Sequence, residues 1–314
     1  MLPLNDFQAL RERARALGPL KLAVAAADDP SILAAAAQAT EAGLVTPVLV
    51  GDPELIGRAM PDTATAAILQ HAESVPTRSP DEAARTAVRL AVEGKAQLLL
   101  KGHIRTDQLL HAVLDKQHGL PREGLLSDVL IYEDSLSGTR RLVAVTDGGL
   151  NVLPTLEQKK QILMNAVNAF HRLGFVRPRV AVMSAVEVVT PAIPSTGEAQ
   201  ELTAMGARAE FPDCEVFGPL ALDNALLEWC ARAKGITSPV AGHADIMLVS
   251  NIDAGNLLGK AVKYLGGSAC AHVVMGTRVP VLIPSRVESA EDKLNSIAFG
   301  VVVYAGSTVS HSRH

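Results

Sequence analysis

Short runs of apolar residues alternate along the chain with longer segments of helical periodicity, and this alternation limits the folds that the chain can adopt. The runs are continuous rather than mixed with polar residues, as expected for strands that helices cover on both faces. They span 22–26, 47–50, 98–100, 129–132, 142–145, 180–183 and 246–249, and the helical segments span 31–42, 81–94, 106–117, 156–173, 221–234 and 254–265. Strands and helices in this order predict an α/β protein with largely parallel sheets.

The expected number of domains follows from the length and the connections. The chain has 314 residues, of which 48% are hydrophobic, and this suits a sizeable core divided between two domains. No Gly-, Ser- or Pro-rich linker separates two halves. We therefore expect the chain to cross between two α/β domains on strands or short connectors, with a small-molecule ligand in the cleft that they flank.

The composition disfavours several classes of function. A net charge of −4 and an aromatic content of 3% argue against a nucleic-acid surface, which needs clustered basic residues and stacking side chains. No apolar run reaches the roughly 18 residues of a membrane span, and the first residues lack the pattern of a signal peptide. The three cysteines are far apart and form no CxxC or Cys/His metal spacing. We expect buried thiols, no metal, no membrane or nucleic-acid partner, and a cytoplasmic location.

The common nucleotide-binding motifs are missing. The first predicted strand leads into Ala-Ala-Asp-Asp-Pro instead of GxGxxG, and no GxxxxGK[ST] segment occurs. NAD on a Rossmann fingerprint and ATP on a P-loop are therefore disfavoured. The chain also has no HExxH and no GxSxG segment.

The segment 251–260 follows a buried strand and opens a predicted helix. Asn256 and Lys260 are four residues apart, so they share one helix face near its start. A lysine beside the amides of a helix N-terminus predicts an anion site. On the alternative interpretation, the Asn and Asp residues of this segment only turn the chain or cap the helix.

Another apolar strand ends in Ser285-Arg286. In open α/β sheets the carboxyl ends of strands face ligands, and the guanidinium of Arg286 can clamp a phosphate. Asp292 has two interpretations. The spacing Ser289-x-x-Asp292 is that of a capping box, which the pattern alone favours. Alternatively, Asp292 projects from the first helical turn into the cleft as a general base.

A third segment runs from Lys101 to Thr106, after another buried strand. Gly102 allows a close backbone approach, and Thr106 can cap the helix that follows. The basic residues suit an anionic ligand, although an ordinary strand-to-helix turn with surface charges explains the same pattern.

Together these segments resemble the phosphate acetyl/butyryltransferase family. The matching pieces are Lys101-Gly102, Thr146-Asp147 with Asn151, 185–187, 218–224, 240–245, 253–256 with Lys260, and Ser285-Arg286 with Asp292. Each piece is weak alone, but their order and spacing over two thirds of the chain are specific.

The resemblance implies an isocitrate/isopropylmalate dehydrogenase-like fold of two α/β domains flanking a cleft. The first domain would comprise 1–130 plus 285–314, and the second 131–284. It also implies a homodimer and the reaction acyl-CoA + phosphate ⇌ acyl phosphate + CoA. A short-chain acyl kinase is a possible pathway partner. Coenzyme A, acyl-CoA and phosphate are then substrates, with no permanently bound cofactor.

The resemblance also implies roles for particular residues. Asp292 would act as the base for the CoA thiol, while Ser285 and Arg286 would lie where charge develops on the carbonyl oxygen and phosphate. For phosphate binding, Arg105 is a candidate arginine, with Arg78 and Arg122 as alternatives. The substrate-binding set is Lys101, Gly102, Thr106, Asp147, Asn151, Glu187, Asp223, Asn224, Gly242, Asp245, Asn256 and Lys260.

Two segments bear on the acyl group. Residues 185–189 and 218–224 resemble the butyryltransferase branch more than the acetyltransferase branch. We therefore expect an acyl group of roughly three to five carbons, with modest selectivity because one methylene changes binding by about 1–3 kcal/mol. The competing hypotheses are an NAD- and metal-dependent dehydrogenase of the same fold and a non-catalytic acyl-CoA sensor.

Overall fold

A computed structural model describes residues 2–136 and 138–311, with the side chains of these residues except 122, 123 and 307–311. The chain divides into two compact units. The central unit comprises 1–7 and 124–270, and the N-terminal unit comprises 8–123 and 271–314. The ranges of the two units follow one another directly along the chain, so no separate linker segment lies between them. Relative to the expected domains 1–130 plus 285–314 and 131–284, residues 1–7 and 124–130 lie in the central unit and residues 271–284 in the N-terminal unit.

The N-terminal unit contains a mixed sheet in the order β3-β2-β1-β4-β11-β10. Its strands are β1 (Leu20–Ala25), β2 (Val45–Gly51), β3 (Glu73–Pro76), β4 (Leu98–Lys101), β10 (Cys270–Thr277) and β11 (Val281–Leu282). All neighbouring pairs are parallel except the antiparallel pair β10–β11. The inner strands β1 and β4 are almost wholly buried, because helices cover both of their faces.

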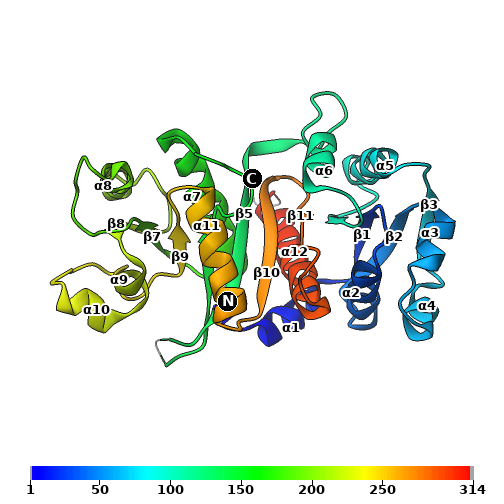
Figure 1. Cartoon of the computed structure of the whole chain (residues 1–314), viewed down its shortest axis with the longest axis horizontal. Helices are drawn as coiled ribbons and strands as arrows, with labels where there is room; N and C mark the ends of the chain where they lie inside the picture. Colours follow the sequence, from blue (N-terminus) through cyan, green and yellow to red (C-terminus); the bar gives the residue numbers. More distant parts are fainter. Residues whose placement is uncertain (1, 137, 312–314) are drawn as a thin grey trace. The chain divides into compact units, whose positions relative to one another are not determined.

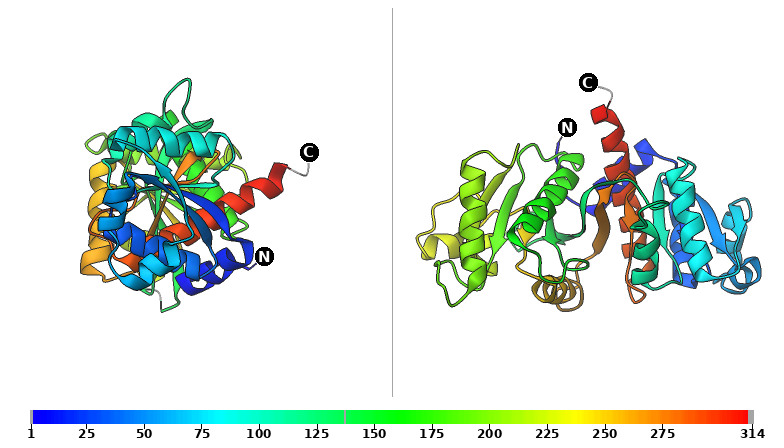
Figure 2. Two further views of the ribbon diagram at one scale, coloured as in Figure 1. Left: turned by 90° about the vertical axis from the view of Figure 1, so that its right-hand side faces the viewer. Right: turned by 90° about the horizontal axis from the view of Figure 1, so that it is seen from above.

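Two layers of helices enclose this sheet. On one face lie α5 (Pro80–Val92) and α6 (Thr106–Val113), and on the other lie α2 (Pro30–Glu41) and α12 (Ala290–His311), which pack against each other (Figure 2, left). The alanine-rich inner face of α2 permits this close packing. The remaining helices of the unit are α1 (Phe7–Leu17), α3 (Pro53–Arg58) and α4 (Thr63–Leu69).

The central unit has a second part of the sheet, in the order β5-β6-β9-β7-β8 (Figure 1). Its strands are β5 (Arg122–Asp134), β6 (Arg141–Thr146), β7 (Arg179–Met183), β8 (Glu215–Leu220) and β9 (Ile246–Leu248). The β5–β6 pair is antiparallel and the other pairs are parallel. The helices are α7 (Leu156–Arg172), α8 (Pro194–Ala207), α9 (Leu222–Leu226), α10 (Glu228–Ala233), α11 (Ile252–Lys260) and the π-helix η1 (Ala261–Leu265).

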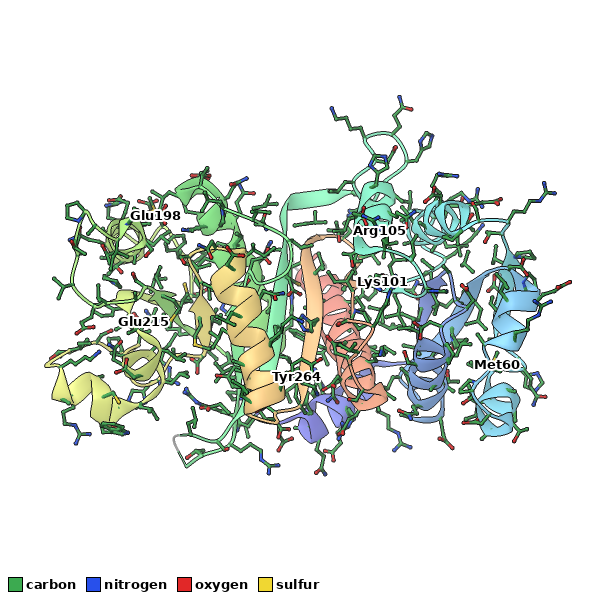
Figure 3. The ribbon with its side chains drawn as sticks, viewed as in Figure 1. Met60, Lys101, Arg105, Glu198, Glu215 and Tyr264 are labelled. Atoms are coloured by element: carbon green, nitrogen blue, oxygen red, sulfur yellow. The ribbon has the colours of Figure 1, made fainter. Side chains whose placement is uncertain are left out.

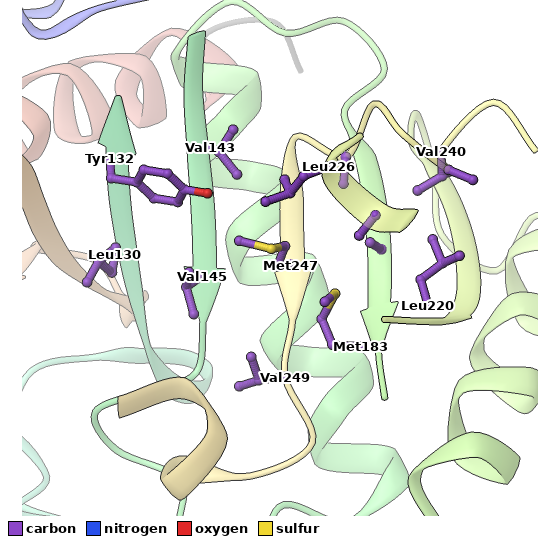
Figure 4. Packing of buried hydrophobic residues seen from close by; sticks show 14 of the residues in the cluster. Leu130, Tyr132, Val143, Val145, Met183, Leu220, Leu226, Val240, Met247 and Val249 are labelled. Atoms are coloured by element: carbon purple, nitrogen blue, oxygen red, sulfur yellow. The ribbon is translucent and has the colours of Figure 1, made fainter. Parts of the chain in front are cut away.

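The core of the central unit follows the two-residue period of its strands. Val143 and Val145 of β6 point to the same face as Met183 of β7 and Met247 of β9 (Figure 4). Leu226 of α9 and residues 240–244 pack onto this face. The loops after β6, β7 and β8 therefore start from a well-packed platform.

The α/β class is confirmed, and each predicted strand and helix overlaps an observed one. The expectation of largely parallel sheets is confirmed, since the pairs β5–β6 and β10–β11 are antiparallel and the other pairs described above are parallel. The predicted helix 221–234 is two helices, since Leu227 is extended between them. No described helix is long and apolar enough to cross a membrane.

Candidate active site

The carboxyl ends of three neighbouring strands in the N-terminal unit bring charged residues together. Strands β1, β4 and β11 are parallel neighbours, so the loops that follow them leave the sheet at one edge. Asp29 and the Ser285-Arg286 pair lie in these loops, and Lys101 lies where the loop after β4 begins. Lys101 is the last residue of β4, and Arg105 lies just before α6 (Figure 3).

Lys101 is a buried cation, with 5% of its surface exposed. Among the described residues, its Nζ donates to the carbonyls of Gly102 and Ile104 alone, both at 3.4 Å. Burial lowers the pKa of Lys101, and the positive charge of Arg286 lowers it further, while Asp29 opposes both effects. The charges of Lys101 and Arg286 therefore act on each other.

Gly102 allows the β1 and β4 loops to touch. Its amide donates to the Ala25 carbonyl at 2.9 Å, and the His103 amide donates to the Ala26 carbonyl at 2.7 Å. A Cβ on Gly102 would lie 2.1 Å from the Ala26 oxygen, so no other residue fits without a shift of backbone. This confirms the predicted close backbone approach.

The prediction that Thr106 caps α6 is wrong. Arg105 occupies the N-cap position, and its amide donates to Gln108 Oε1 at 3.4 Å. Thr106 is the first residue inside the helix. Arg105 is one of the arginines considered for phosphate binding. Its guanidinium already forms an ion pair with Asp107, at 2.8 Å. The side chain of Arg122 lies outside the described residues.

The Ser285-Arg286 pair lies in an exposed turn. The Glu288 amide donates to the Ser285 carbonyl at 3.2 Å, which closes the turn. Both side chains are accessible. Within the described chain, the guanidinium of Arg286 forms no hydrogen bond or ion pair, so it can receive an anionic group.

Asp292 forms the predicted capping box with Ser289. Its Oδ2 accepts from the Ser289 hydroxyl and, at 3.2 Å, from the Ser289 amide, while its own amide donates to Ser289 Oγ at 3.1 Å. The residue is 1% exposed. The capping interpretation is therefore confirmed, and it fixes the carboxylate seven residues after Ser285, at the start of α12.

In the central unit, Asp147 and Asn151 organise the loop after β6. Asp147 accepts from the amides of Gly149 and Leu150 at 2.8 and 2.9 Å, and from Asn151 Nδ2 at 2.6 Å. Burial raises the pKa of Asp147, the charge of Asp128 adds to this, and the hydrogen bonds oppose it. These two predicted residues do lie together.

Glu187 and Asp223 also lie together, joined by a residue that the sequence did not indicate. Lys234 Nζ lies 3.3 Å from a carboxylate oxygen of each. The loop after β7 is thereby linked to α9 and α10. The neighbouring Asn224 is fully buried, and neither side-chain amide atom has a partner among the described residues.

Asp245 occupies a different place from the other candidates. Both of its carboxylate oxygens accept from Arg179, at 2.9–3.0 Å, and Arg141 lies 3.9 Å away. These residues stand at the amino ends of β9, β7 and β6. We therefore assign Asp245 a structural role at the amino edge of these strands, opposite to the edge where the loops after β6 and β7 leave them.

Gly242 likewise has a structural reason for its identity. It has a φ of +80°, and a Cβ there would lie 2.4 Å from Glu228 Cα. Its amide donates to the Asn224 carbonyl at 2.8 Å, which joins the loop to α9.

Asn256 and Lys260 share a face of α11, but the predicted placement near the helix start is wrong for Lys260. Lys260 is the last residue of α11, at the end opposite the N-terminal amides. The N-cap is Asn251, whose Oδ1 accepts from Ala254 N at 2.9 Å. Asn256 instead reaches the loop after β6, where its Nδ2 lies 3.4 Å from the Gly148 carbonyl.

Sequence reasoning missed several charged residues of these loops. Asp29 stands in an Asp-Asp-Pro segment that matches no glycine-rich motif, and no other sequence pattern marks it as part of a site. Lys293 and Glu288 flank the predicted Asp292, yet no pattern marks a lysine as buried. Among the described residues, no group of three or more His, Cys, Asp or Glu side chains is placed to hold a metal ion.

Comparisons with known proteins agree with the geometry. The family described as phosphate acetyl/butaryl transferase matches residues 69–301. The chain is 38% identical over 301 residues to phosphate acetyltransferase of Rhizobium meliloti, covering 96% of this chain and 94% of that protein. It is 38% identical over 281 residues to the probable phosphate butyryltransferase of Bacillus subtilis, covering 89% and 92%.

A solved structure of a phosphotransacylase is similar to this chain over most of its length. The branched-chain phosphotransacylase from Enterococcus faecalis superposes with a TM-score of 0.80 at 31% identity, covering 91% of this chain and 99% of that one. The family match spans more than half of the chain, and both relatives are similar over most of their length. The chain therefore belongs to the phosphate acetyl/butyryltransferase family and is a phosphate acyltransferase.

Proposed function

We propose that the protein transfers a short-chain acyl group between coenzyme A and inorganic phosphate, and that it favours a butyryl-like group over acetyl. The observation that supports the site most is that Lys101 ends β4, while Arg286 and Asp292 follow the parallel neighbour β11, so all three lie at or after strand ends at one edge of the N-terminal unit's sheet. This edge combines two cations for phosphate with one carboxylate for proton transfer.

The phosphate is bound by the two cations. Lys101 supplies a buried ammonium whose present partners are two long carbonyl contacts, so an anion would complete its coordination. Arg286 supplies a planar guanidinium that can bind two phosphate oxygens at once. Ser285 donates to the carbonyl oxygen of the acyl group as negative charge develops there. Such donors contribute about 3–4 kcal/mol each.

Asp292 accepts the proton of the CoA thiol. A thiol with a pKa of about 8.5 or above is mostly protonated at neutral pH, so a base is needed to form the thiolate. The thiolate attacks the carbonyl carbon of the acyl phosphate, the C–S bond forms, and the C–O bond to phosphate breaks with its electron pair leaving on phosphate. In the other direction, a phosphate oxygen attacks the thioester, and the leaving thiolate takes its proton back from Asp292.

The central unit is proposed to bind coenzyme A and the acyl chain. The residues assigned to it are Asp147, Asn151, Glu187, Asp223, Asn224, Asn256 and Lys260. Gly102 and Thr106 contribute backbone at the phosphate side, and Gly242 and Asp245 hold loops in place. We further propose that the two units form an isocitrate/isopropylmalate dehydrogenase-like fold with the substrates in the cleft that they flank.

The preference for a longer acyl group is supported by residues 185–189 and 218–224, which resemble the butyryltransferase branch. Relatives with acetyl and butyryl names are equally similar, at 38% identity. The acyl preference therefore depends on those segments. We also propose that the protein works as a cytoplasmic homodimer and that a short-chain acyl kinase consumes the acyl phosphate.

The experiment that tests this proposal is CoA release from acetyl-, propionyl-, butyryl- and isobutyryl-CoA, followed with a thiol reagent, with and without phosphate. Phosphate-dependent release fastest with butyryl- or isobutyryl-CoA supports the whole proposal. Fastest release with acetyl-CoA would overturn the acyl preference alone. No release from folded protein would favour a non-catalytic acyl-CoA sensor, and reduction of NAD by a hydroxy acid would favour a dehydrogenase.

A further inference from the structure

Lys293 is a fully buried lysine in the first turn of α12, with 1% of its surface exposed. Its Nζ donates to the carbonyl oxygen of Glu288 at 2.5 Å. An isolated buried ammonium is strongly unfavourable, so such a residue needs hydrogen bonds and opposite charges around it. The position of Lys293 directly after Asp292 connects it to the proposed chemistry.

The charged groups that surround Lys293 come from several elements. Asp29 at the start of α2, Glu288 in the turn and Asp292 in α12 attract its charge, while burial opposes it and lowers the pKa of Lys293. Lys101 at the end of β4 repels it. His272 of β10 lies 3.7 Å from Glu288. Three carboxylates thus balance the two buried ammonium groups.

The contacts of Lys293 fasten the turn that carries Ser285 and Arg286. The turn is closed by the Glu288 amide on the Ser285 carbonyl. Its far end is held to α12 by Lys293 on the Glu288 carbonyl and by Asp292 on Ser289. Arg286 has no partner of its own in the described chain, so its position depends on these two attachments.

We propose that Lys293 is a positioning residue for acyl transfer: its ammonium holds the Ser285–Glu288 turn through the Glu288 carbonyl and places a positive charge next to Asp292. This inference rests on the proposed function. A neutral side chain of similar length would loosen the turn and remove a positive charge beside the base. Both effects reduce the rate without removing any group that touches the substrates.

The test compares Lys293→Met, Lys293→Gln and Lys293→Arg with the wild type in phosphate-dependent CoA release. For Lys293→Met we expect kcat to fall about 10- to 100-fold, because a small displacement of a positioned group lowers the rate by about that factor. The KM for CoA should change less than about threefold, because Lys293 is not among the residues proposed to bind CoA. The acid limb of its pH–rate profile should move to higher pH, because the carboxylate has lost a nearby positive charge. Lys293→Arg should recover most of the rate.

A matched control separates this role from stability alone. Lys159 of α7 is also buried and pairs with Glu198, but it belongs to the central unit, whereas Asp292 belongs to the N-terminal unit. Lys159→Met should lower stability and leave the acid limb unchanged. If Lys293→Met does not fold, the rate and pH profile of Lys293→Gln test the inference instead. The Gln side chain keeps a donor for the Glu288 carbonyl and still removes the positive charge.

The outcomes are distinguishable. An active wild type with a slowed Lys293→Met or Lys293→Gln enzyme and a displaced acid limb supports the inference. If the wild type is active and the folded Lys293 variants match Lys159→Met in rate and pH profile, the inference is overturned while the proposed function stands. If the wild type releases no CoA, the proposed function fails and this inference fails with it.

Discussion

Replacing Asp292 by asparagine separates the two roles of this side chain, because Asn keeps an acceptor for the capping box and loses the ability to take a proton. The wild-type carboxylate accepts two hydrogen bonds from Ser289 and lies in the first turn of α12. Losing its charge removes a favourable interaction with the helix N-terminus, about 0.3–1 kcal/mol, and the attraction of Lys293. We expect the free energy of unfolding to fall by about 1–2 kcal/mol. General-base catalysis contributes about 10²–10⁴ in rate, so kcat should fall by that factor, equal to about 2.7–5.4 kcal/mol of barrier.

The matched variant is Ser289→Ala, which removes the other half of the capping box. Loss of an N-cap costs about 0.5–2 kcal/mol, so the two variants should have similar stability in urea unfolding. Their kcat values for phosphate-dependent CoA release should differ by about 100-fold or more, with Ser289→Ala keeping most of its activity. Equal rates for the two variants would refute the assignment of Asp292 as the base and leave it with the capping role alone.

Other substitutions test the remaining parts of the account. Gly102→Ala should destabilise the protein by about 1–3 kcal/mol in urea unfolding, because its Cβ would lie 2.1 Å from a backbone oxygen. Gly57→Ala, a helical site with nothing within 4 Å, should instead be neutral or gain up to about 1 kcal/mol. Asp245→Ala should cost about 3 kcal/mol or somewhat less in urea unfolding, since Arg179 is 35% exposed, and should keep kcat per folded molecule. Lys101→Met should raise KM for phosphate about tenfold or more in steady-state assays, and an unchanged KM would remove it from the phosphate site. Burial raises the pKa of Cys214 to about 11, so a thiol reagent at pH 8 should label it slowly in native protein and quickly in urea.

Much of the fold could be predicted because it follows from local patterns. Continuous apolar runs predicted the inner strands, and helical periodicity predicted the helices between them. Strand β8 was missed because its Gly-Pro interrupts the apolar run, and β3 because it is a short edge strand with little burial. The antiparallel pairs depend on contacts between residues far apart in sequence, which periodicity does not report.

The site was predictable where one segment determines the geometry. The capping box of Asp292 and the close approach at Gly102 both follow from local spacing. Asp245 shows where prediction from sequence fails. A polar residue beside a predicted strand can lie at either end of the sheet, and only the folded structure shows that Asp245 pairs with Arg179 at the amino edge. Lys234 and Lys293 were missed for a related reason. Their environment is made by carboxylates from other segments, and a single sequence does not show which segments meet.

The measurement that tests the central claim most directly is thioester synthesis from butyryl phosphate and CoA by the purified protein, with release of inorganic phosphate measured in the same sample. The account predicts one phosphate released for each thioester formed. It also predicts that the reverse reaction, from butyryl-CoA and phosphate, yields an acyl phosphate that hydroxylamine traps as the hydroxamate. Phosphate release without thioester formation, or folded protein with no activity in either direction, would contradict it.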